Sequence, residues 1–182
     1  MKITNIRIRP VAAPMKRPLV TSVATLTASA LLLIDLDTDA GIVGRSYLFA
    51  LGKQNLPAMA KLVEAMAEMV KGDAVAPFDL ERKLRARYAL LGVHNVVLMA
   101  MAGIDMAAWD ALAQSLGQPL VRVLGGAPRP IPAYNSKGLG LMPLPALAKE
   151  AEELIGEGFR AIKLRMGRPT AREDLDALRA VK

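Results

Sequence analysis

Two short apolar stretches, each followed by a helix-like stretch, limit the fold of the second part of the chain. Residues 131–136 and 161–165 have the alternating pattern of strands, whereas residues 145–157 and 170–182 have the pattern of helices. The order strand, helix, strand, helix is typical of parallel βα units, which form a barrel when they are repeated. The sequence therefore predicts two consecutive βα units.

The second of these predicted strands carries two cations. Because side chains alternate along a strand, Lys163 and Arg165 lie on one face, and Ile162 and Leu164 lie on the other. In a βα barrel, charged side chains at the C-terminal end of a strand mark the catalytic face. Lys163 and Arg165 are therefore the candidate catalytic residues.

The first part of the chain has a different pattern, because predicted strands come first and predicted helices follow. This order indicates a small α+β domain with an antiparallel meander. The domain is placed at residues 1–125, and the Gly- and Pro-rich segment 125–130 leads into the βα part at 126–182. The expected strands are 2–10, 30–38 and 42–49, and the expected helices are 56–70, 79–91 and 95–116.

A long connection separates the first two predicted strands. Residues 11–29 are far more than a meander needs, and the stretch from Leu19 onward is uncharged. Loops of this length are usually lids, binding loops or disordered segments. We expect a lid that covers an apolar group, with disorder as the alternative.

Composition and charge exclude several classes of function. The formal net charge is +7, but only 4% of residues are aromatic, so bases would find almost no stacking surface and nucleic-acid binding is not expected. No uninterrupted apolar run approaches about 18 residues, so no membrane span is expected. Cys is absent, which fits a cytoplasmic protein. His94 is the only histidine, and Asp35, Asp37 and Asp39 lack the Gly and Glu that a calcium loop requires.

Several longer motifs resemble one protein family. The segments 103–113 and 118–125, together with Gly41–Ala50 and Gly158–Lys163, are similar to the enolase superfamily and, within it, to the mandelate racemase/muconate lactonizing enzyme group. The resemblance covers essentially all 182 residues. It implies an N-terminal α+β capping domain, followed here by the first two β-α units of a (β/α)8 TIM-type barrel.

The resemblance also implies a reaction and roles for the two cations. Members abstract a proton next to a carboxylate, and Mg2+ stabilises the enediolate that forms. Lys163 matches the first lysine of the family's lysine-x-lysine pair, which would neutralise the substrate carboxylate. Arg165 replaces the second lysine; a guanidinium stays protonated and only donates hydrogen bonds, so it suits an oxyanion clamp better than a base.

Four further residues match substrate-contacting positions of the family. Leu19 and Leu26 match apolar lid positions, Ser136 matches a substrate-contacting serine, and Lys137 stands where a histidine occurs. Together with Arg165, the extra cation favours an acid-sugar or hydroxyacid dehydratase, a lyase. A mandelate-racemase-like racemase, an isomerase, is the alternative.

By resemblance, the metal-binding carboxylates belong to the third, fourth and fifth barrel strands, and a His–Asp dyad belongs to later ones. We therefore expect no metal ligands in this chain, a truncated and incomplete barrel, and no activity from the 182 residues alone. The expected partners are a small carboxylate substrate and further copies of the chain. A non-catalytic fragment or an oligomerising remnant remains a further alternative.

Overall fold

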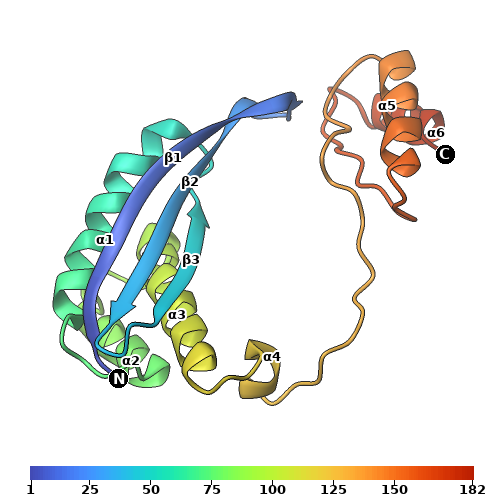
Figure 1. Cartoon of the computed structure of the whole chain (residues 1–182). Coiled ribbons are helices and arrows are strands. Elements are labelled where there is room, and N and C mark those ends of the chain that lie inside the picture. The colour runs from blue at the N-terminus through green and yellow to red at the C-terminus, as the bar shows by residue number, and fades with distance from the viewer. The chain divides into compact units, whose positions relative to one another are not determined.

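The computed structural model describes residues 1–182 and divides into two compact units (Figure 1). The N-terminal unit comprises Met1–Ala13 and Ser29–Pro128. The C-terminal unit comprises Arg129–Lys182 together with Pro14–Ala28, a segment that comes from the first part of the sequence. Each unit is described by itself.

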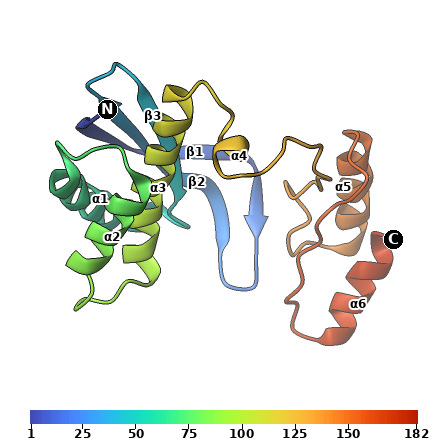
Figure 2. The same cartoon turned by 90° about the horizontal axis from the view of Figure 1, so that it is seen from below.

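The N-terminal unit contains a three-stranded sheet in the order β1-β2-β3. The strands are β1 (Ile3–Val20), β2 (Thr25–Thr38) and β3 (Val43–Phe49), and β2 pairs antiparallel with β3 so that Leu32 lies opposite Leu48. The helices α1 (Leu56–Val70), α2 (Pro77–Arg87) and α3 (Asn95–Ser115) pack on one face of this sheet (Figure 2). The predicted α+β arrangement with an antiparallel meander is confirmed.

The expected long loop at residues 11–29 is wrong, because β1 and β2 continue through it as a hairpin. The turn is closed by the amide of Thr21, which donates to the carbonyl oxygen of Ala24 at 2.9 Å, and by the Thr21 hydroxyl, which accepts from the Ala24 amide at 3.0 Å. Strand β1 contains three prolines, at positions 10, 14 and 18. They are tolerated because β1 lies at the edge of the sheet and pairs with β2 on one side only. A proline whose missing N–H would face the open side removes no hydrogen bond to β2.

The core of the N-terminal unit lies between the sheet and the helices. Leu32, Ile34 and Leu36 alternate along β2 and are fully buried, as the period of two requires. Strand β3 lies directly against α3: a Cβ atom on Gly44 would stand only 2.0 Å from the carbonyl oxygen of Ala107. Gly44 on the strand and Ala107 and Ala111 on the helix therefore allow a close approach of two backbones.

The helical boundaries follow local signals in the sequence. α1 and α3 match their predicted ranges, and α3 ends before Gly117, which has a φ of 60°. α2 ends at Arg87, earlier than the expected residue 91. The remaining short helices of this unit are η1 (Lys53–Asn55) and α4 (Leu120–Val123).

By length and composition, helix α3 could cross a membrane, although it contains no uninterrupted apolar run of about 18 residues. In the structure it is a central helix of the N-terminal unit. It packs against β3 and α1, and Ala100, Ile104 and Ala108 on it are fully buried. Its apolar character is explained by this core position.

The C-terminal unit contains two helices, α5 (Leu144–Gly156) and α6 (Ala171–Ala180). A capping box begins α6: the Thr170 hydroxyl accepts from the Glu173 amide at 3.2 Å, and the Glu173 carboxylate accepts from the Thr170 amide at 2.8 Å. A small core of five buried residues lies beneath these helices: Leu139, Leu147, Ala151, Leu154 and Ala177.

The strands expected at 131–136 and 161–165 are wrong in extent, because only one parallel bridge forms, between Asn135 and Ile162. At residues 136–138, side chains bind backbone groups that a strand ladder would use. The Asn135 side-chain oxygen accepts the Lys137 amide at 3.1 Å, and the Arg165 guanidinium donates to two carbonyl oxygens of the neighbouring segment. The predicted parallel orientation is confirmed, but beyond this bridge the two segments are joined largely through side-chain hydrogen bonds to backbone groups.

Candidate functional site

The candidate site lies in the C-terminal unit, where segments 135–139 and 161–165 run side by side. The Asn135 amide donates to the carbonyl oxygen of Ala161 at 2.8 Å, and the Lys163 amide donates to that of Asn135 at 2.8 Å. Further along, the Arg165 amide donates to the carbonyl oxygen of Leu139 at 3.1 Å. These bonds bring the two candidate cations of one segment beside the candidate residues of the other.

The Arg165 side chain is half-buried and is held by the backbone of the first segment. Its guanidinium donates to the carbonyl oxygen of Gly138 and, at 3.2 Å, to that of Ser136. A guanidinium has five N–H donors, so these two bonds leave others for a further partner. Arg165 therefore joins the two segments, a structural use that the sequence did not indicate.

The Lys163 side chain differs from that of Arg165, because it is exposed and takes part in none of the ion pairs of the chain. Its backbone is fixed by the bond to Asn135, whereas its ammonium group has no carboxylate partner. Lys163 thus presents a charge that an external anion can neutralise.

Lys137 is placed in an ion pair. Its ammonium lies 2.5 Å from a carboxylate oxygen of Glu157, the residue that follows α5. The Lys137 ammonium, together with the Asn135 amide at 3.1 Å, holds the pKa of the Glu157 carboxyl below its usual range. The Lys137 ammonium is consequently neutralised by Glu157, unlike that of Lys163.

Asn135 is a buried polar residue of the candidate site that the sequence did not single out. It is only 4% exposed, and its side chain contacts three groups: the Lys137 amide, the Leu154 carbonyl oxygen and the Glu157 carboxylate. A polar residue inside a short apolar stretch was the available signal, since a buried amide needs partners. Asn135 orients the start of the first segment.

The remaining candidate residues lie at the periphery. The Ser136 side chain is exposed, while its carbonyl oxygen accepts from Arg165. Leu19 and Leu26 are half-buried on the two arms of the β1–β2 hairpin. A Leu19 methyl carbon lies 3.5 Å from the position that a Cβ on Gly140 would take. The structure thus places Leu19 beside the first segment.

The residues of this chain do not fit a magnesium site. No group of three or more His, Cys, Asp or Glu side chains is arranged to hold a metal ion. Mg2+ prefers near-octahedral oxygen ligands, of which proteins usually supply one or more carboxylates. The Glu157 and Glu150 carboxylates, which accept hydrogen bonds from Asn135 and Leu139, are already paired with Lys137 and Arg17.

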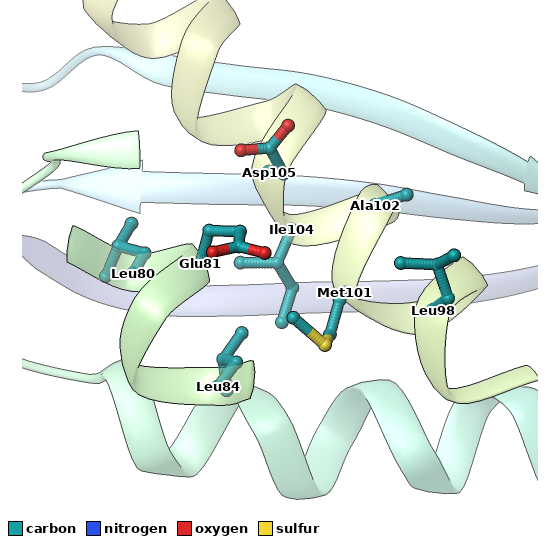
Figure 3. A pocket seen from close by; sticks show the side chains of 8 residues that line it. All are labelled: Leu80, Glu81, Leu84, Leu98, Met101, Ala102, Ile104 and Asp105. Atoms are coloured by element: carbon teal, nitrogen blue, oxygen red, sulfur yellow. The ribbon is translucent and has the colours of Figure 1, made fainter. Parts of the chain in front are cut away.

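A cavity of about 130 Å³ lies in the N-terminal unit between α2 and α3 (Figure 3). Its walls are apolar except for Glu81 and Asp105. Burial and the nearby Glu81 charge raise the pKa of Asp105. Because both polar groups are carboxylates, this cavity does not suit an acidic ligand, and the candidate site remains the one around Lys163 and Arg165.

Comparison with known proteins identifies the class. A meander with helices on one face, followed by βα segments, is the arrangement of the N-terminal part of enolase-superfamily proteins. Residues 3–125 match the family model described as mandelate racemase/muconate lactonizing enzyme, N-terminal domain. The chain belongs to this mandelate racemase/muconate lactonizing enzyme family.

Curated relatives have several activities. The chain is 30% identical to an L-Lys-D/L-Arg epimerase of Desulforapulum autotrophicum, over 92% of this chain and 46% of the relative. It is 31% identical to an L-talarate/galactarate dehydratase of Salmonella typhimurium, over 86% of this chain and 40% of the relative. The chain therefore spans less than half of the length of either relative.

Solved structures show the same similarity. An enolase from the alphaproteobacterium bal199 with bound Mg has a TM-score of 0.93 and 35% identity, covering 99% of this chain and 51% of that one. An enolase from Bradyrhizobium in complex with magnesium and mandelic acid has a TM-score of 0.85 and 39% identity, covering 99% of this chain and 50% of that one.

Proposed function

We propose that this chain is the N-terminal part of an enzyme that removes a proton next to the carboxylate of a small hydroxy acid, and that the whole protein is a dehydratase. The observation that carries the proposal is the contrast between two adjacent cations. Lys163 has no carboxylate partner in the chain, whereas Arg165 is held by backbone carbonyl groups. One charge is available to a substrate and the other is fixed in place.

In the proposed reaction, the Lys163 ammonium binds the substrate carboxylate. Removal of the adjacent proton, by a base that the rest of the protein would supply, places additional negative charge on that group, and a cation in a preorganised position stabilises the charge as it develops. The exposed ammonium and the hydrogen-bonded backbone of Lys163 support this role.

Arg165 is proposed as a donor to the same developing oxyanion and not as a base. A guanidinium remains protonated in proteins, so it cannot accept the substrate proton. Its bonds to Ser136 and Gly138 support a fixed position, since a clamp must be held before the substrate arrives.

Mg2+ is proposed for the whole protein because similar structures carry it. The carboxylates of this chain do not form a site for the ion, so the roles of Lys163 and Arg165 are derived without it. We also propose that residues 1–125 act as the capping domain, that residues 126–182 begin the barrel, and that the protein forms homo-oligomers.

A racemase is the second candidate. It is favoured by the Bradyrhizobium protein, which is 39% identical to this chain and was solved with mandelic acid. A dehydratase is preferred because a two-base racemase would need a base at position 165, where the chain has an arginine.

The test uses the complete protein encoded by the gene, with Mg2+, on a panel of acid sugars and hydroxy acids that includes mandelate. Dehydration of an acid sugar, which removes the α proton and the hydroxyl of C3 as water, leaves an enol at C2 that becomes a 2-keto acid. Racemisation in D2O exchanges the α proton without loss of water, and NMR distinguishes the two. Lys163→Ala is expected to lower kcat/KM by about 100-fold or more. Lys149→Ala, which removes an exposed lysine of α5, is the matched control and should change little.

Two outcomes contradict the proposal. Activity retained in Lys163→Ala would remove the carboxylate-binding role of that residue. Proton exchange without formation of a keto acid would replace the dehydratase by the racemase.

A further inference from the structure

The end of the β1–β2 hairpin, residues 14–28, is hereafter called the hairpin tip, and it clusters with the C-terminal unit. One backbone bond joins it to the segment that follows the candidate site: the Leu141 amide donates to the carbonyl oxygen of Val20 at 3.0 Å. Because this bond joins the hairpin tip to a segment that is distant in sequence, it forms only when the tip contacts that segment.

Two glycines make room for the tip. A Cβ on Gly140 would lie 2.8 Å from the carbonyl oxygen of Val20 and 3.0 Å from its nitrogen, so another residue there would displace the tip backbone. A Cβ on Gly167 would lie 3.0 Å from the Cβ of Ser22. The tip therefore lies close to the backbone at Gly140 and Gly167, and we call this site the slot. The approach is possible because neither residue has a side chain.

Arg17 is the charged contact of the hairpin tip with α5. Its guanidinium donates to a carboxylate oxygen of Glu150 at 3.1 Å and to one of Glu153 at 2.8 Å. The two glutamates are three residues apart and so lie on one face of the helix. The Glu150 side chain is only 15% exposed and also accepts the Leu139 amide at 2.7 Å, which links the tip to the loop after the first segment.

We propose that Arg17 is an ionic latch that holds the hairpin tip closed on α5, and that Gly140 provides the slot into which the tip closes. The neighbouring Lys16 is exposed and has no ion pair, so the latch depends on one specific cation and not on the general basic charge of the tip. The proposal stands without the proposed function, since every contact belongs to the chain itself.

The latch has a consequence for Leu19, which lies against Gly140 on the same arm of the hairpin as Arg17. When Arg17 is bound to α5, Leu19 is held beside the candidate site. When the ion pairs are broken, the backbone bond at Leu141 and the contacts at Gly140 and Gly167 remain to retain it. Because exposed ion pairs are screened by salt, opening of the tip is expected to increase with ionic strength.

The experiment measures amide hydrogen exchange of the 182-residue chain by NMR, with the Leu141 amide as the reporter. Arg17→Gln is expected to accelerate exchange at Leu141 about fivefold, as expected for loss of a partly exposed ion pair. Lys16→Gln removes the same charge from the adjacent residue and should change the rate less than about 1.5-fold. The Asn135 amide, which bonds to Ala161 away from the tip, is the internal reference and should be unchanged.

Two further variants separate the latch from the slot. Arg17→Gln combined with Glu153→Gln should exchange no faster than Arg17→Gln alone, because both substitutions break one contact. Gly140→Ala should accelerate the Leu141 amide while the charges remain. High salt should accelerate the wild type but not Arg17→Gln.

Two results would overturn the latch. The first is an equal Leu141 rate in the wild type, Arg17→Gln and Lys16→Gln. The second is equal acceleration of Leu141 and Asn135, which would mean that Arg17 stabilises the entire C-terminal unit and does not hold the tip in particular.

Discussion

The two units of the chain are stabilised in different ways. In the N-terminal unit, a continuous core joins all three strands to α1, α2 and α3. In the C-terminal unit, the buried core has only five residues. Order in the C-terminal unit therefore depends more on polar side chains that bind backbone groups: Asn135, Glu150, Arg165 and Asp174.

The difference teaches how a functional segment can be ordered with little hydrophobic burial. Each of these polar side chains satisfies backbone groups that a sheet would otherwise satisfy. The Asp174 carboxylate, for example, accepts the amides of Gly167 and Arg168, and these bonds hold its pKa below the usual range. Hydrogen bonds from side chains to the backbone thus position the catalytic candidates, whereas hydrophobic packing stabilises the N-terminal unit.

The largest effect is expected in the N-terminal core. Ile104→Ala removes a fully buried side chain of α3 and should lower the free energy of unfolding by about 3–4 kcal/mol. Denaturant unfolding followed by circular dichroism measures it. Leu98→Ala on the same helix, where the side chain is 44% exposed, is the control and should cost less than about 1 kcal/mol. Equal losses in the two variants would contradict the described core.

A smaller and local effect is expected in the C-terminal core. Leu154→Ala removes one of the five buried residues, and about 2–3 kcal/mol should be lost, confined to α5 and α6. Hydrogen exchange should then accelerate in these helices but not in α1. The adjacent Ile155, which is 44% exposed, provides the matched control as Ile155→Ala. Acceleration in α1 as well would show that the two units unfold together.

The smallest effect concerns the half-buried Asp105 of the N-terminal unit, whose pKa is raised by burial and by Glu81. A raised folded-state pKa means that the ionised form costs stability, and this cost develops as pH rises through the unfolded and then the folded pKa. Asp105→Asn should therefore raise the stability at pH 7 by less than about 1 kcal/mol and have no effect near pH 3.

Thermal unfolding at the two pH values measures this difference. Glu68→Gln, at an exposed position of α1, is the control and should be neutral at both. A stabilisation by Asp105→Asn that persists at pH 3 would rule out ionisation as its cause.

Local signals in the sequence predicted the helices well. The Thr170–Glu173 capping box and the glycine after α3 act over a few residues, so they can be recognised without tertiary structure. The hairpin tip could not be predicted in the same way. Its prolines indicate a loop unless one knows that β1 lies at the edge of the sheet, which is a property of the whole fold.

The sequence pointed to residues of the candidate site but not to the contacts that those residues make. Lys163 and Arg165 were found from their spacing and from the family resemblance. The partners of Arg165, however, are carbonyl groups of a segment 29 and 27 residues earlier, and carbonyl groups carry no sequence signal. The ion pair between Lys137 and Glu157 joins residues that are 20 positions apart, and the partners of Asn135 are also set by the fold, so these contacts became visible only in the structure.

The prolines of β1 have one more consequence, which concerns other molecules. An edge strand of 18 residues would ordinarily offer a long row of free amides to any strand that approached it. Pro10, Pro14 and Pro18 have no amide hydrogen to offer, and Lys16 and Arg17 add charge to the same stretch. A second chain therefore finds no continuous ladder along this edge, so the hairpin can be long without promoting aggregation.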